Sequence, residues 1–129
     1  MDDRETYEAG MKVRRAVLGD KHVDKSLAKQ NEFSQPFQDL ITRYAWGEMW
    51  SRPGLPRGTR SLVTLAMLVA LNRSDEFRLH LRAAANNNVT REEIQELLLQ
   101  SAIYCGVPAA NHAVKEASAI VQELGLLKG

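Results

Sequence analysis

Apolar residues recur at helical spacing along almost the whole chain, and no stretch alternates apolar and polar residues as a half-buried strand does. In the segment 35–50 the apolar positions fall at i, i+3, i+4 and i+7, namely Phe37, Leu40, Ile41 and Tyr44. We expect this stripe to face the core of an amphipathic helix. The pattern therefore predicts an all-α fold, a compact bundle of about six helices.

Glycine, proline and capping residues mark the expected helix ends. Ser34 is the predicted N-cap of its helix, with Pro36 in the first turn, and Thr90 with Glu93 forms a capping box. The expected helices are 4–18 (ending at Gly19), 24–30, 35–50, 59–72, one from Ser74 to the asparagines 86–88, one from Thr90 to Gly106, and 108–124 (ending at Gly125).

Two of these helices have distinctive apolar patterns. The helix over 59–72 is apolar on nearly all sides, which predicts the buried centre of the bundle. The last helix is expected to bury Ala113, Ala117, Ile120, Val121 and Leu124.

The length and charge of the chain indicate how many domains it forms and which kinds of partner it can bind. A chain of 129 residues fits a single domain over 1–129. Its 17 Lys and Arg against 16 Asp and Glu give no field that would attract nucleic acid or a membrane. The apolar run 62–71 is half the length of a membrane span, and the polar start MDDRETYEAG is unlike a signal peptide. We expect a cytoplasmic protein without nucleic-acid or membrane partners.

Cys105 is the one cysteine of the chain, so neither an intramolecular disulfide nor a cysteine-pair metal site can form. A lone thiol fits a reducing compartment. We expect the Cys105 side chain to have a packing role.

Glu48 continues the apolar stripe of its helix one turn beyond Tyr44, between Trp46 and Trp50. A carboxylate facing a core is costly unless it is paired or lies in a cleft, which makes Glu48 a candidate site residue. The alternative is that the helix has frayed by this point and Glu48 is exposed.

Glu76 and His80 stand at i, i+4, on one face of their expected helix. His80 lies at the border of the apolar stripe, whereas Arg78 and Arg82 fall on the opposite, solvated side. A histidine held by a carboxylate suits proton transfer near neutral pH. The alternative is a histidine buried for structural reasons. A metal site is disfavoured because no third ligand is indicated.

Arg52, Arg57 and Arg60 surround a loop rich in proline and glycine. The guanidinium group matches carboxylates with a planar pair of donors, so these arginines are candidates for binding an acid. The alternative is a solvated basic loop. His22 and His112 have no evident partner in the sequence and are interpreted as bystanders.

Several segments resemble the carboxymuconolactone decarboxylase family, in the order expected for it and over nearly the whole chain. They are Arg14-Arg15-x-Val17-Leu18-Gly19-Asp20 with Val23-Asp24, Trp46-Gly47-Glu48-Met49-Trp50-Ser51-Arg52-Pro53-Gly54-Leu55 with Arg60-Ser61-Leu62, Glu76-x-x-x-His80-Leu81-Arg82-Ala83-Ala84, and Tyr104-Cys105-Gly106-Val107-Pro108-Ala109-Ala110. Asn88 stands where the family pattern has glycine, and asparagine tolerates the left-handed conformation that glycine favours.

The resemblance implies an alkylhydroperoxidase-D-like helical fold that assembles into trimers, usually paired as hexamers. It also implies the decarboxylation of 4-carboxymuconolactone to 3-oxoadipate enol-lactone, in the protocatechuate branch of the β-ketoadipate pathway, without a cofactor or metal. The substrate would be a small lactone carrying two carboxylates.

Site roles follow from this implied reaction. His80 is the expected proton donor, oriented by Glu76 or working with Glu48. Carboxylate or oxyanion contacts are assigned to Arg52 and Arg60, with Arg57 as a weaker candidate. Three aromatic side chains would wall the site and exclude water: Trp46, Trp50 and Tyr104.

Two other classes of function remain as alternatives. One is a non-catalytic helical oligomer that binds a small organic acid or a partner. The other is a thiol peroxidase-like enzyme, which the absence of a Cys-x-x-Cys pair opposes.

Overall fold

The computed structural model describes residues 2–126, and every regular element in that part of the chain is a helix. The chain divides into two compact units, Met1–Pro56 (unit 1) and Arg57–Gly129 (unit 2). The predicted all-α fold is confirmed, while the expectation of one domain over 1–129 stays a prediction. None of the described helices is long and apolar enough to cross a membrane.

Unit 1 begins with a pair of helices joined directly at Gly19. Asp2 caps the first helix by accepting a hydrogen bond from the Glu5 backbone N–H at 2.8 Å. Gly19 ends it with φ 91°, and the next helix begins at once, four residues earlier than expected. The positive φ of glycine makes this turn possible without a loop. The helices are α1 (Asp3–Leu18) and α2 (Asp20–Lys29).

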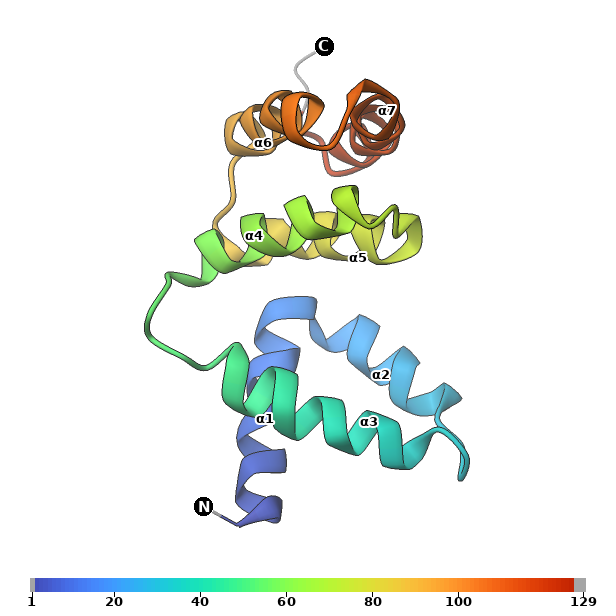
Figure 1. The fold of residues 1–129 in the computed structure, drawn as a ribbon. Coiled ribbons are helices and arrows are strands. Elements are labelled where there is room, and N and C mark those ends of the chain that lie inside the picture. The colour runs from blue at the N-terminus through green and yellow to red at the C-terminus, as the bar shows by residue number, and fades with distance from the viewer. Residues whose placement is uncertain (1, 127–129) are drawn as a thin grey trace. The chain divides into compact units, whose positions relative to one another are not determined.

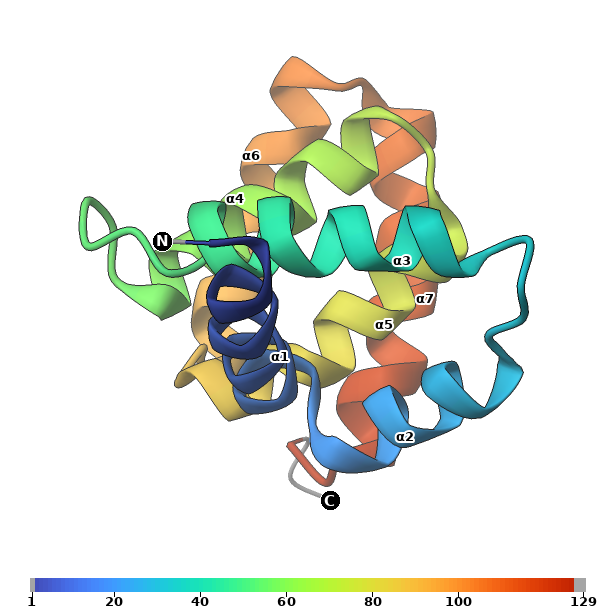
Figure 2. The same ribbon diagram turned by 90° about the horizontal axis from the view of Figure 1, so that it is seen from below.

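The expected helix over 35–50 is present, but it changes its hydrogen-bond pattern halfway. It consists of α3 (Gln35–Ile41) followed by a π-helical segment, η1 (Thr42–Met49), and Figure 2 shows the two as one continuous helix that crosses α1. Ser34 does not cap it, since the Ser34 Oγ accepts a hydrogen bond from the Asn31 backbone N–H at 3.0 Å instead.

The predicted apolar stripe of this helix is wrong. Phe37, Leu40 and Tyr44 are 59%, 49% and 62% exposed, and the buried side chains are Thr42, Trp46 and Trp50. Within η1 a turn of the π-helical pattern takes more than four residues, so the buried positions fall four apart, at Thr42, Trp46 and Trp50. Phe37 and Leu40 lie in α3, before this segment, and their side chains are left uncovered.

Two glycines let α1 and η1 touch through their backbones. A Cβ added to Gly10 would lie 2.0 Å from the Thr42 carbonyl oxygen and 2.9 Å from the Gly47 nitrogen. A Cβ added to Gly47 would lie 2.7 Å from the Thr6 carbonyl oxygen. No side chain fits at either position.

Unit 2 stacks two helical hairpins, and Figure 1 shows α4 with α5 in one layer and α6 with α7 in the next. Residues with positive φ make the turns, including Asn88 at φ 61°, as its left-handed tolerance predicts. The predicted capping box is confirmed, with Thr90 Oγ1 and the Glu93 backbone N–H 3.1 Å apart. The elements are α4 (Arg57–Ala70), α5 (Ser74–Ala84), a 3₁₀ turn η2 (Ala85–Asn87), α6 (Arg91–Tyr104) and α7 (Val107–Glu123).

α4 is not the buried centre that its composition predicts. It buries a single stripe, Ser61, Leu65 and Val69, whereas Met67 and Leu71 are 59% and 65% exposed. An all-round apolar helix needs neighbours on every side, and unit 2 covers α4 mainly with α5 and α6.

The last helix follows its prediction at four of five positions. Ala113, Ala117, Ile120 and Val121 are buried, and Gly125 ends the segment with φ 71°. Leu124 is 37% exposed because it lies beyond the end of α7.

Replacing Gly10 with alanine should destabilise the protein by about 3 kcal/mol, because the new methyl group overlaps backbone atoms that cannot rotate away. The gain in helix propensity, about 1 kcal/mol, is smaller. Urea unfolding monitored by circular dichroism measures the change. Gly54→Ala is the matched control, since nothing lies within 4 Å of its added Cβ. A Gly10→Ala protein as stable as Gly54→Ala would contradict the backbone contact of α1 with η1.

Candidate functional site

Gly58 places the start of α4 against the end of α5 in unit 2. A Cβ at Gly58 would lie 2.8 Å from the Asn87 carbonyl oxygen, so the two backbones are in contact there. Arg60 follows this contact by two residues on α4, and His80 lies in the second half of α5.

Arg60 and His80 both lie at the border between the protein interior and the solvent. Both side chains are half-buried, and Arg60 Nε and His80 Nδ1 are shielded from solvent. Arg57, three residues before Arg60, is exposed. The predicted stripe beside His80 is confirmed, because Phe77 and Leu81 are 2% and 1% exposed.

Glu76 precedes His80 by one turn of α5, as the spacing requires, and its side chain is exposed. Its role in orienting His80 stays a prediction. Tyr104 is 82% exposed, and it borders a groove of about 530 Å³ together with Leu62, Val63 and Ala66 of α4.

Unit 1 holds the remaining candidates on and after η1. Trp46 and Trp50 stack with ring centroids 5.3 Å apart and are 6% and 9% exposed. Glu48 lies on the opposite side of η1 and is exposed, as is Arg52 in the loop that follows. The core-facing interpretation of Glu48 is therefore wrong. The alternative was right about its exposure, although the helix continues to Met49.

The sequence interpretation missed a polar network that joins α5 to α7. His112 Nε2 lies 2.9 Å from Ser74 Oγ and 3.0 Å from Glu116 Oε1, and Arg78 donates to the same Glu116 carboxylate. The Glu116 side chain is 11% exposed. His112 and Glu116 stand at i, i+4, the signal that singled out Glu76 and His80, so the sequence contained the clue.

This network has a structural role. In a hydrolytic triad the serine and the acid contact different nitrogens of the imidazole, whereas here both contact Nε2. Arg82 adds a second link by donating to Glu123 at 2.8 Å and 3.2 Å. Arg78 and Arg82 thus connect α5 to α7. Their side chains are 39% and 48% exposed, so the side is solvated as predicted and carries ion pairs in addition.

Cys105 is half-buried and packs against the apolar core of unit 2, as predicted. Within residues 2–126, no three His, Cys, Asp or Glu side chains gather closely enough to hold a metal ion.

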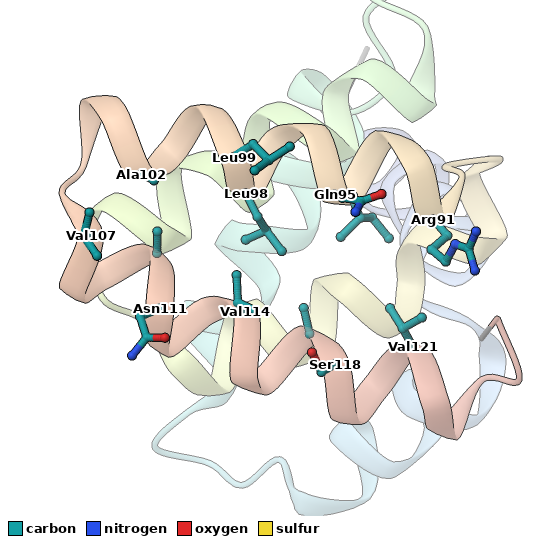
Figure 3. A pocket seen from close by; sticks show the side chains of 13 residues that line it. Arg91, Gln95, Leu98, Leu99, Ala102, Val107, Asn111, Val114, Ser118 and Val121 are labelled. Carbon is teal, nitrogen blue, oxygen red and sulfur yellow. The ribbon is translucent and has the colours of Figure 1, made fainter. Parts of the chain in front are cut away.

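An apolar groove of about 690 Å³ runs between α6 and α7, and Figure 3 shows the side chains that border it. Aliphatic residues such as Leu98, Leu99 and Val114 form its walls, and Arg91 stands at one end. None of the candidate site residues lines this groove. Its apolar character makes it unsuited to a substrate with two carboxylates.

Comparison with known proteins gives consistent results. The family model described as "Carboxymuconolactone decarboxylase family" matches residues 35–119. A 4-carboxymuconolactone decarboxylase of Acinetobacter baylyi is 54% identical over 126 residues, which cover 98% of this chain and 94% of the relative. A nitrosuccinic acid decarboxylase of Metarhizium robertsii is 44% identical over 111 residues, covering 86% and 78%. A 4-carboxymuconolactone decarboxylase of Pseudomonas putida is 58% identical over 48 residues, covering 37% of this chain and all of the relative.

Proposed function

The chain belongs to the carboxymuconolactone decarboxylase family, and we propose that it converts 4-carboxymuconolactone to 3-oxoadipate enol-lactone in the protocatechuate branch of the β-ketoadipate pathway. The observation that carries the proposal is 54% identity to the Acinetobacter decarboxylase over nearly the full length of both chains. The prediction of a carboxy-lyase is confirmed by this relationship. We also propose that the enzyme acts in the cytoplasm.

The proposed substrate supplies its own electron sink. The bond between the ring carbon and its carboxylate breaks, CO₂ leaves, and the electron pair spreads through the ring double bond onto the lactone oxygen. One proton then returns to carbon. The protein has three tasks: to hold the carboxylates, to stabilise the negative lactone oxygen and to deliver the proton.

Within unit 2 we assign the proton to His80 and carboxylate or oxyanion contacts to Arg60, with Arg57 as the weaker candidate. Arg60 on α4 and His80 on α5 are both half-buried. Partial burial lowers the local dielectric, which strengthens contacts with an anion. Glu76 would support the charged form of His80 from one turn away.

In unit 1, Glu48 and Arg52 are exposed, and we keep Glu48 as a candidate acid and Arg52 as a candidate carboxylate contact. We propose that Trp46 and Trp50 act on the site by holding η1 in place, since their rings stack inside unit 1. Tyr104 stays a candidate wall residue.

We also propose that the enzyme is a homo-oligomer, a trimer or hexamer. Residues 97–114 form the end of the α6–α7 hairpin and contain no Asp, Glu, Lys or Arg. Leu99, Ile103 and Val107 in this stretch are 60%, 78% and 67% exposed. Apolar surface without charge is typical of the centre of a subunit interface.

His80→Gln should lower kcat about a hundred-fold or more while leaving thermal unfolding and subunit association unchanged, because it removes a positioned acid. Loss of lactone absorbance measures turnover, and unfolding is measured on the same samples. The matched control is His112→Gln, which should change stability and leave kcat unaffected. A folded His80→Gln enzyme with near-normal kcat would eliminate His80 as the acid and leave Glu48 as the candidate.

Nitrosuccinic acid should be a second, slower substrate. Both acids contain a –CH₂–COO⁻ arm on the carbon that bears the leaving carboxylate, together with an electron sink, the nitro group in one and the unsaturated lactone in the other. The relative from Metarhizium, with 44% identity, motivates the comparison. We expect kcat/KM to be roughly 10² to 10⁴ lower than for the lactone, measured as released CO₂. Succinate, which has no sink, is the control. Nitrosuccinate loss no faster than in buffer would contradict this prediction.

Light scattering should give the mass of a trimer or hexamer, and Ile103→Glu should lower that mass because a charge would be buried at the interface. Gln122→Glu, an exposed polar position on α7 outside residues 97–114, is the control and should leave the mass unchanged. A monomeric parent protein would refute the oligomer, and an unchanged mass in Ile103→Glu would refute this surface as the interface.

A further inference from the structure

Two adjacent arginines on α1 have opposite environments. Arg15 is partly exposed and donates to two carboxylates, Asp20 at 3.0 Å and Asp24 at 2.8 Å. Arg14 is only 6% exposed, and no carboxylate within residues 2–126 forms an ion pair with it. The more buried charge is thus the one without a counter-ion.

The contacts that Arg14 makes are long and go to neutral groups. Its Nη2 donates to Ser26 Oγ of α2 at 3.3 Å and to Gln38 Oε1 of α3 at 3.5 Å. Its Nε is buried and has no hydrogen-bond partner in the described part of the chain. A guanidinium carries five N–H donors, and the buried Nε–H of Arg14 is left for a further acceptor.

A buried arginine cannot relieve this situation by losing its proton. Burial lowers the pKa of Arg14 from its usual value, but guanidinium groups stay protonated in proteins. Breaking or omitting the partner of a buried ion is strongly destabilising. Among the charged neighbours of Arg14, Tyr7 raises its pKa and Arg15 lowers it. Burial and the charges of Arg14 and Lys25 lower the pKa of His22 on α2.

We propose that Arg14 is the anchor of a carboxylate-binding site formed by α1, α2 and α3 of unit 1. The two carboxylate oxygens would accept from Nε and Nη2, and the Ser26 hydroxyl and the Gln38 amide would donate to the same group. One monoanionic, planar carboxylate matches one buried guanidinium in charge and shape, whereas a phosphate dianion would exceed the charge available. The carboxylate belongs either to a small organic acid or to an acidic side chain of a second copy of this chain.

The local test is the ¹⁵N–¹H resonance of Arg14 Nε, assigned by its disappearance in Arg14→Gln. Succinate should shift this resonance and slow its exchange with solvent, while sodium chloride of equal ionic strength should not. This measurement does not depend on decarboxylation. The Arg14 site can therefore be refuted without refuting the proposed activity, and the reverse is also true. A response to inorganic phosphate without one to succinate would overturn the assignment to carboxylate.

Thermal unfolding gives a second measurement. Saturating succinate should raise Tm by about 3 °C in the parent protein. Arg14→Gln and Arg14→Lys should each lose most of this rise, since glutamine lacks the charge and lysine lacks the two-pronged donor set. Arg4→Gln is the matched control on the same helix, because Arg4 is exposed and pairs with Glu8. An equal rise in Arg14→Gln would place the succinate elsewhere and refute Arg14 as the anchor of a small organic acid.

Dilution distinguishes the two sources of the carboxylate. If a second copy supplies the carboxylate, the Nε resonance should already be shifted at high protein concentration. It should move back to its unbound position on dilution, and succinate should not change it. If a small acid supplies it, the resonance should follow succinate and be independent of protein concentration. A resonance that responds to neither would show that Ser26 and Gln38 satisfy Arg14, and the proposal would be wrong.

Discussion

Backbone contact at glycine is the constraint on which the placement of the candidate site residues depends. Gly10 lets α1 approach η1 so closely that the Thr42 carbonyl occupies the space of a side chain. The position of η1, and with it Glu48, follows from that contact. Gly58 does the same in unit 2, where it brings the start of α4 to the Asn87 carbonyl. Arg60 stands at this end of the α4–α5 hairpin because the helices cannot slide past each other while these backbones touch.

Charge is distributed inside the protein in two ways that suit an enzyme acting on acids. The Glu116 side chain is 11% exposed, and its carboxylate contacts both Arg78 and His112. These contacts compensate the buried negative charge and connect α5 to α7. Arg14 is buried without such compensation. A protein that binds anions must keep some cations unneutralised by its own carboxylates, because an arginine already held by an aspartate has little attraction left for a ligand.

The helix ends were predictable from local sequence, and the buried faces were less so. The capping box of Thr90 and Glu93, the left-handed Asn88 and the turn at Gly19 all form as expected, since each depends on residues within one turn. The stripe through Phe37 failed because nothing covers Phe37 and Leu40 on α3, and because π-helical bonding changed the period from Thr42 onward. For the candidate site, half-burial of His80 agreed with its place on the helical wheel, whereas Glu48 was misplaced by the same change of period.

By itself the sequence determined the helical class, most of the helix ends and membership of the family, because capping, helical periodicity and residue identity are local properties of the chain. Only the tertiary structure decided which surfaces are buried and which polar groups meet. His112 and Ser74 are far apart in sequence and 2.9 Å apart in space. Arg14 looks like its neighbour Arg15 in the sequence, yet only Arg15 meets carboxylates. Burial and pairing depend on neighbours brought together by packing, and packing is a property of the folded units as wholes.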